Sequence, residues 1–162
     1  MHSFCACAPL IFLTGYMLSS GALMKVVMAF GTFDVLHPGH ISYLEQAKKM
    51  GNSLIVVVAR DSSVVMIKGR LPVFGEKERL RMVSSLKVVD RAVLGAKVKT
   101  ENGRFGIIRR FRPSIIALGY DQQKNAEALE RWLKEKGIGA KVVRMKAMRP
   151  YTYRSSLIKN RF

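Results

Sequence analysis

Runs of mainly apolar residues, spaced along the chain with helical patterns between them, constrain the fold more than any other feature of this sequence. Four runs cover residues 24–30, 54–59, 114–120 and 140–145, and residues 91–95 form a shorter fifth candidate. None of them alternates apolar with polar residues. Each is therefore predicted to be a strand buried on both faces, as in a parallel sheet.

The segments between these strands carry apolar residues at helical spacing. Ile41, Leu44 and Ala47 mark one face of a helix that is predicted to end at Gly51. Further helices are predicted over residues 76–86, 104–111, 125–136 and 155–160. Alternating strands and helices predict right-handed crossovers, and so a single α/β domain with a doubly wound parallel sheet. Such sheets bind ligands where their strands end, so the chemistry is expected just after residue 30.

Residues 1–23 differ from the rest of the chain. They contain no Lys, Arg, Asp or Glu, and they hold both cysteines, Cys5 and Cys7. Their apolar run is too short to span a bilayer and lacks the positive start of a signal peptide. We interpret residues 1–23 as a start-site extension or disordered tail, with a cleaved signal as the alternative, and residues 24–162 as the domain. A domain without cysteine suits a cytoplasmic protein.

The charge of the chain is strongly positive, with 28 Lys and Arg against 11 Asp and Glu and a net charge of +17. Such a surface attracts polyanions, either nucleic acid or a phosphate-bearing substrate with an anionic co-substrate. A generally basic surface without a specific partner explains the composition equally well. Composition therefore does not choose between these functions, and motifs must decide.

The segment Gly31-Thr-Phe-Asp-Val-Leu-His-Pro-Gly-His40 follows the first predicted strand. Its Pro-Gly pair predicts a tight turn that places His40 at the start of a helix, where backbone N–H groups and the helix dipole attract phosphate. His37 and His40 can donate hydrogen bonds to phosphate oxygens that gain charge in a displacement. Zinc binding is the alternative, but zinc takes three or four ligands, and residues 24–162 hold neither cysteine nor a third histidine. No metal site is predicted on protein side chains.

This segment resembles the His-x-Gly-His signature of the cytidylyltransferase-like nucleotidyltransferase superfamily. The resemblance implies a Rossmann-like nucleotidyltransferase fold. It also implies that His37 and His40 contact the nucleotide phosphates and stabilise the transition state at the α-phosphate. The neighbouring residues of the turn are expected to bind the nucleotide as well, namely Thr32, Phe33, Pro38 and Gly39.

Three later segments extend the resemblance across most of residues 24–162. Lys68 matches a phosphate-binding lysine in the loop after the second strand, with a solvated basic loop as the alternative. Asp121, after the fourth strand, is expected to bind the nucleotide, with a turn-capping role as the alternative. Arg149, Ser155 and Ser156 match the family's second signature, in which an Arg precedes Ser-Thr-Thr at a helix start. The residues between them depart from that signature, which leaves the choice of base open.

Residues outside these motifs are given structural roles. Asp90 is expected to serve structure or a subunit contact rather than chemistry. The aromatic residues Trp132, Phe105 and Phe111 lie in amphipathic segments and are expected to form core or a subunit contact.

The order of all the motifs resembles the archaeal FAD synthase family. This resemblance implies transfer of AMP from ATP to FMN with release of pyrophosphate, Mg²⁺ bridging the phosphates, and a homodimer. A cytidylyltransferase acting on glycerol 3-phosphate is the alternative, although residues 149–156 match its Arg-Thr-Glu-Gly-Ile-Ser-Thr-Thr poorly. A nucleic-acid-binding module is the third hypothesis, which the spread of basic residues and the lack of a known binding motif disfavour.

Overall fold

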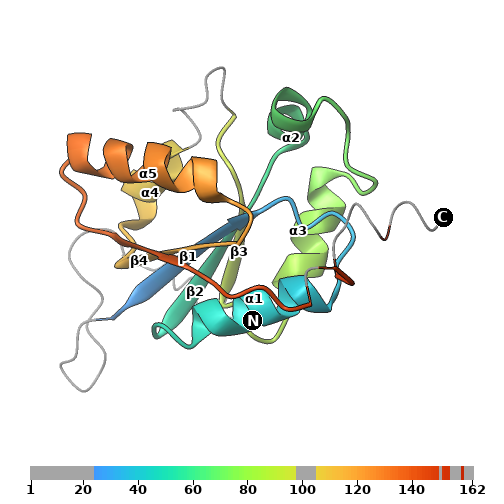
Figure 1. The fold of residues 1–162 in the computed structure, drawn as a ribbon, viewed down its shortest axis with the longest axis horizontal. Helices are drawn as coiled ribbons and strands as arrows, with labels where there is room; N and C mark the ends of the chain where they lie inside the picture. The colour runs from blue at the N-terminus through green and yellow to red at the C-terminus, as the bar shows by residue number, and fades with distance from the viewer. Residues whose placement is uncertain (1–23, 98–104, 150, 154–157, 159–162) are drawn as a thin grey trace, which may run out of the picture.

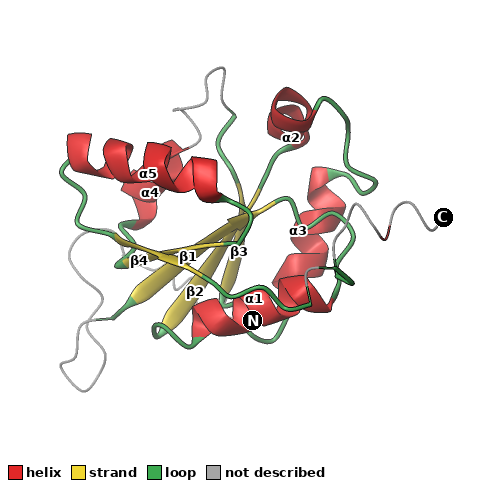
Figure 2. Ribbon diagram, viewed as in Figure 1, coloured by secondary structure: helices red, strands yellow, loops and turns green. Residues whose placement is uncertain are grey.

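The computed structural model describes residues 24–97, 105–149, 151–153 and 158, and this part contains one five-stranded sheet (Figures 1 and 2). All strands are parallel and lie in the order β3-β2-β1-β4-β5. The strand order reverses between β1 and β4, so the sheet is doubly wound as predicted, with its switch point at these two strands. The strands are β1 (Val26–Gly31), β2 (Ser53–Val58), β3 (Arg91–Leu94), β4 (Ile115–Leu118) and β5 (Lys141–Arg144).

Helices cover both faces of the sheet, with α4 and α5 on one side and α1 and α3 on the other (Figure 1). The helix predicted over residues 76–86 ends at residue 84, and the one predicted to begin at Asn125 begins two residues earlier, with Gln122 as its N-cap. The predicted helix over residues 155–160 falls almost entirely outside the described residues. The helices are α1 (Pro38–Lys48), α2 (Asp61–Lys68), α3 (Glu76–Ser84), α4 (Gly106–Phe111) and α5 (Gln123–Glu135).

Helix α2 was not predicted from the sequence, and its presence corrects the loop assigned to Lys68. Lys68 is the last residue of this helix, and Gly69 ends it with a left-handed φ of 68°. Only Val64 of its eight residues is buried. A short helix with one buried residue has no apolar stripe that would identify it in the sequence.

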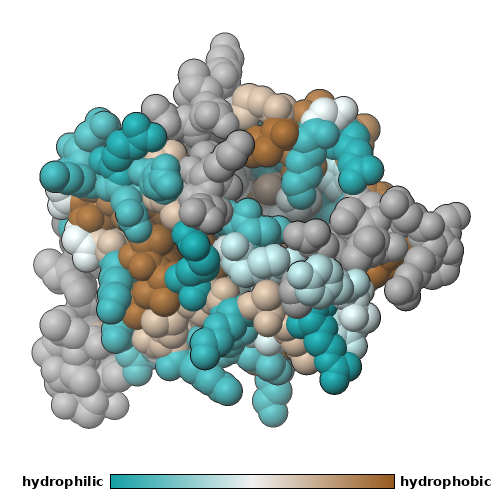
Figure 3. All heavy atoms as spheres, viewed as in Figure 1, coloured by the Kyte–Doolittle hydropathy of each residue, from teal (hydrophilic) through white to brown (hydrophobic). Residues whose placement is uncertain are grey.

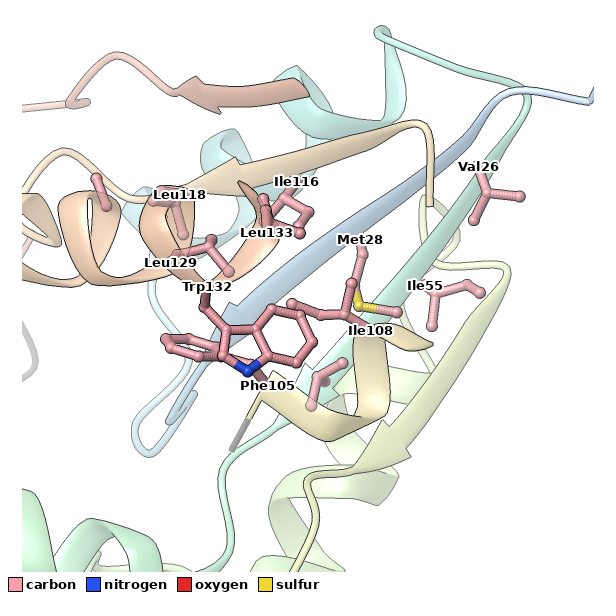
Figure 4. Packing of buried hydrophobic residues seen from close by; sticks show 12 residues of the cluster. Val26, Met28, Ile55, Phe105, Ile108, Ile116, Leu118, Leu129, Trp132 and Leu133 are labelled. Carbon is pink, nitrogen blue, oxygen red and sulfur yellow. The ribbon is translucent and has the colours of Figure 1, made fainter. Parts of the chain in front are cut away.

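The core has two layers because successive residues of β1 point to opposite faces of the sheet. Val26 and Met28 pack against α4 and α5, where Trp132 and Phe105 lie with ring centroids 5.7 Å apart (Figure 4). Val27 points to the other face of the sheet and packs in the second layer, against α1 and α3. The expected core role of Trp132 and Phe105 is confirmed, and Phe111 packs at the edge of the same layer. No helix among the described residues is both long and apolar enough to cross a membrane.

Asp90 has the structural role expected of it. Its carboxylate accepts hydrogen bonds from Leu54 N at 2.6 Å and from Lys48 Nζ at 2.5 Å. Burial alone would raise the pKa of Asp90, but these two donors outweigh burial and lower it. This ion pair ties the end of α1 to the beginnings of β2 and β3. It lies at the amino ends of the strands, and the candidate site lies at their carboxyl ends.

Candidate active site

A cavity of about 580 Å³ lies at the carboxyl ends of the strands, around the switch point between β1 and β4. Three groups of residues line it: the turn between β1 and α1, helix α2 with the loop behind it, and the segments that follow β4 and β5. Most of the predicted site residues lie on this cavity, namely Thr32, Phe33, His37, Gly39, His40, Lys68 and Asp121.

The paired imidazoles meet at the first turn of α1. Pro38 is the first residue of the helix and is itself exposed, and His37 is the N-cap in extended conformation. The ring centroids of His37 and His40 are 3.9 Å apart and the rings stack with an interplanar angle of 23°. Within the described part of the chain, Nδ1 of each ring is buried without a hydrogen-bond partner. Because these Nδ1 atoms are buried, Nε2 is the ring nitrogen left to contact a ligand.

Both imidazoles are neutral at neutral pH. Burial lowers the pKa of His37. Burial lowers the pKa of His40 most, followed by repulsion from His37 once that ring is protonated and from the Lys68 ammonium, so that it lies at about 3. A neutral imidazole still donates one N–H, so the pair can bind phosphate oxygens without carrying charge.

The low pKa of His40 predicts a pH-dependent stability. In the unfolded chain His40 binds a proton below about pH 6.5, whereas in the folded chain it does not until much lower pH, so stability falls as the pH falls below 6.5. Between pH 7.5 and 5.5, His40 alone should remove roughly 1 kcal/mol from the free energy of unfolding. Urea unfolding at both pH values measures this loss. The His40→Gln variant should lose less than the wild type over the same interval, and equal losses in the two proteins would contradict the prediction.

Phe33 supports the imidazole pair from below. It has a φ of 51°, is buried, and meets His40 edge to face with ring centroids 5.4 Å apart. A Cβ at Gly31 would lie 2.7 Å from the Phe33 ring, so this position accepts only glycine without a shift of that ring. Phe33 therefore restricts the position of the His40 ring. The nucleotide contact predicted for Phe33 stays a prediction.

Tyr43 joins the ends of β1 and β4 and was not predicted as a site residue. Its hydroxyl donates to Ala117 O at 2.8 Å and accepts from Phe30 N at 3.2 Å, so it joins the ends of β4 and β1. Burial raises the pKa of this hydroxyl, which keeps it a proton donor. Tyr43 lies one helical turn after His40, on the same face of α1, and that spacing is the signal that could have indicated it.

Arg79 holds the elements around the site together, although no role was predicted for it. Its side chain is fully buried, and it donates to Thr32 O, to Ala59 O at 2.8 Å and to Phe74 O at 2.9 Å. It also forms an ion pair with Asp61 at 2.6 Å. One guanidinium thus fixes the ends of β1 and β2, the start of α2 and the loop before α3. A buried arginine on an amphipathic helix has the same sequence pattern as an exposed one, so burial could not be predicted.

The opposite wall of the cavity follows β4 and β5. Asp121 is exposed there, and its neighbour Gln122 donates to Phe30 O at 3.3 Å. Lys146 lines the same wall, and its backbone exchanges hydrogen bonds of 2.9 and 3.1 Å with the side-chain amide of Gln46 on α1. This exchange holds the segment after β5 against α1. Lys146 was not predicted as a site residue, because no strand-end motif marks it.

The second signature is only partly covered. Arg149 is exposed and does not line the cavity, and its carbonyl accepts from Thr152 N and Tyr153 N in a turn. Tyr153 itself lines the cavity. The serines of this signature, Ser155 and Ser156, lie outside the described residues. The nucleotide-binding roles of Arg149 and the two serines stay predictions.

The parallel sheet, the switch-point cavity and the imidazole pair at its first turn define a nucleotidyltransferase-type domain. A family model described as Cytidylyltransferase-like matches residues 28–161, and the chain belongs to this family. Among curated relatives, "FAD synthase" of Methanosarcina mazei is 48% identical over 82% of this chain and 84% of its own length. "FAD synthase" of Methanothrix thermoacetophila is 50% identical over 78% of this chain and 85% of its own length.

Solved structures agree with this assignment. The crystal structure of a "lipopolysaccharide core biosynthesis protein" from Thermoplasma volcanium is 44% identical, covers 77% of this chain and 98% of its own, and superposes with a TM-score of 0.70. A pantoate-beta-alanine ligase from Francisella tularensis shares only 17% identity, over 89% of this chain and 67% of its own, with a TM-score of 0.57. The second similarity shows the fold alone.

Proposed function

We propose that this protein is an FAD synthase, which transfers AMP from ATP to FMN and releases pyrophosphate. The observation that carries the proposal is the stacked, neutral His37–His40 pair on a switch-point cavity, in a chain about half identical to archaeal proteins named FAD synthase. Those relatives favour FMN over glycerol 3-phosphate as the acceptor. The cytoplasmic location and the homodimer implied by the family resemblance remain predictions.

The reaction needs positioning and charge stabilisation more than covalent help. A phosphate oxygen of FMN attacks the α-phosphorus of ATP in line, a new P–O bond forms, and the bond to the bridging oxygen breaks as pyrophosphate leaves. His37 and His40 donate N–H groups to the non-bridging oxygens as charge develops on them. Lys68, whose ammonium lies 3.2 Å from Thr32 Oγ1, supplies positive charge beside them. No general base is required because the attacking phosphate is already ionised.

A divalent cation fits the site only as a partner of the substrate. The cavity is lined by two carboxylates, Asp34 and Asp121, and Asp34 is buried with an oxygen already accepting from Phe74 N. The described residues contain no cluster of three or more His, Cys, Asp or Glu side chains that could hold a metal. Mg²⁺ would therefore be held mainly by phosphate oxygens, with Asp121 as the available protein ligand, and would neutralise phosphate charge.

The proposed activity is tested by offering each nucleotide with each acceptor. Purified protein is incubated with Mg²⁺ and either ATP or CTP, together with either FMN or glycerol 3-phosphate, and pyrophosphate and FAD are measured. FAD and pyrophosphate should form in equal amounts from ATP and FMN only. Pyrophosphate from CTP and glycerol 3-phosphate, with none from ATP and FMN, would establish the alternative acceptor. Salt-sensitive RNA or DNA binding without any turnover would instead support the nucleic-acid-binding hypothesis.

A further inference from the structure

We propose that the isoalloxazine ring of FMN packs on one wall of the cavity, formed by Ile67, Leu71 and Pro72, and that Ile67 and Leu71 make the site selective for flavin. We call these three residues the α2 wall. The inference rests on the proposed function and deepens it, because it assigns the acceptor to one side of the cavity.

The α2 wall exposes large apolar side chains to the cavity. Ile67 at the end of α2 is 53% exposed, and Leu71 in the following loop is 68% exposed, yet both line the cavity. Figure 3 shows hydrophobic atoms reaching the surface where α2 lies in Figure 1. Single exposed apolar residues are ordinary, but apolar side chains gathered on the wall of a ligand cavity indicate a binding surface.

The α2 wall is held in a fixed position relative to the imidazole pair. At its beginning, Lys68 Nζ lies 3.2 Å from Thr32 Oγ1 in the turn between β1 and α1. Beyond its end, Phe74 N donates to Asp34 Oδ1 of the same turn at 3.0 Å, and Arg79 binds the Phe74 carbonyl. Both ends of the α2 wall are therefore tied to the turn between β1 and α1. Because the wall is formed before a ligand arrives, less entropy is lost on binding.

The chemistry of this wall suits a ligand that has a flat ring with an apolar edge and, on a separate chain, a phosphate. Aliphatic side chains from Ile67 and Leu71 stand beside the cations Lys68 and Arg70, all on the same side of the cavity. The dimethylbenzene edge of a flavin needs apolar contact without hydrogen-bond partners, and its phosphate needs a cation.

The opposite wall has a different character that suits the nucleoside. Asp121, Gln122 and Lys146 line it, and their polar side chains suit a ribose and a base better than an apolar ring. In-line displacement requires the acceptor to enter from a direction taken neither by the nucleoside nor by the leaving pyrophosphate. The α2 wall provides that direction, so the flavin is placed there and the adenosine on the opposite wall.

Two matched pairs of variants test the assignment. Ile67→Ala and Leu71→Asp alter the α2 wall. Met66→Ala and Val73→Asp are their controls, because these residues are neighbours of similar exposure, 46% and 62%, that do not line the cavity and receive the same kind of substitution. The KM for FMN should rise about tenfold or more in Leu71→Asp and severalfold in Ile67→Ala, while the KM for ATP stays within about twofold. All four positions are exposed, so the fold should tolerate every change.

Direct binding separates the flavin ring from the reaction. The protein is titrated into FMN and into riboflavin, which has the ring without the phosphate, and the quenching of flavin fluorescence is measured. Leu71→Asp should weaken the binding of both flavins, whereas the Val73→Asp control should bind them as the wild type does. A wild type that forms FAD, together with wall variants that both keep its flavin binding and its KM for FMN, would overturn the assignment of the flavin ring to the α2 wall. That result would leave the proposed function intact. A wild-type protein that neither binds FMN nor forms FAD would overturn the proposed function together with this inference.

Discussion

The His40→Ala variant is expected to form FAD about 100-fold or more slowly than the wild type, by comparison with the loss of a single oxyanion donor in other enzymes. His40 is stacked on His37 and supported by Phe33, so its N–H is aimed before the nucleotide binds. Removing it leaves an α-phosphate oxygen without a preorganised donor in the transition state. The measurement is kcat at saturating ATP and FMN, with FAD separated by chromatography.

The fold should survive this substitution, and a neighbouring variant controls for it. Ile41 follows His40 on α1, is 38% exposed and does not line the cavity, so Ile41→Ala should keep kcat within about twofold of the wild type. Circular dichroism of both variants should match the wild type. Near-normal turnover in His40→Ala would contradict the catalytic role of the imidazole pair, because a residue that merely packs there would change stability and not kcat.

The sequence predicts best where the physical signal is local. Strand β1 follows from an apolar run that ends at Gly31, and the start of α1 follows from Pro38, whose fixed φ suits the first helical position. The doubly wound topology then follows from the alternation of strands and helices, since parallel strands need crossovers of one hand. These local signals place the imidazole pair on the cavity without any knowledge of long-range contacts.

The features that sequence reasoning missed depend on contacts between distant segments. Tyr43 bonds Ala117, 74 residues away. Its spacing from His40 places it on the face of α1 that carries the imidazole, but this local pattern does not indicate the distant carbonyl that its hydroxyl binds. Helix α5 begins at Gln123 rather than at the expected Asn125 cap, because Gln122 instead occupies the N-cap and bonds the Phe30 carbonyl. Such positions are decided by tertiary hydrogen bonds, which outweigh local capping preference.

The Arg79→Met variant should be the most destabilised of the single-residue changes considered, with a loss of about 3 kcal/mol in the free energy of unfolding. Methionine roughly preserves the buried volume but removes every donor. The carbonyls of Thr32, Ala59 and Phe74 then lose their partner, and Asp61 loses its ion pair. For a chain of this size, the midpoint of thermal unfolding should fall by roughly 6–12 °C. Urea unfolding and calorimetry measure the two quantities.

The exposed Arg81 on the same helix supplies the control. Arg81→Met removes the same charge from a protein of net charge +17, yet it should change the free energy of unfolding by no more than about 0.5 kcal/mol. Arg79→Lys should recover little stability, because one ammonium cannot reproduce the planar fork that reaches three carbonyls and a carboxylate. If Arg79→Met and Arg81→Met were equally stable, the buried guanidinium would not be what joins β1, β2 and α2. Another contact would then have to hold Lys68 at its position relative to the imidazole pair.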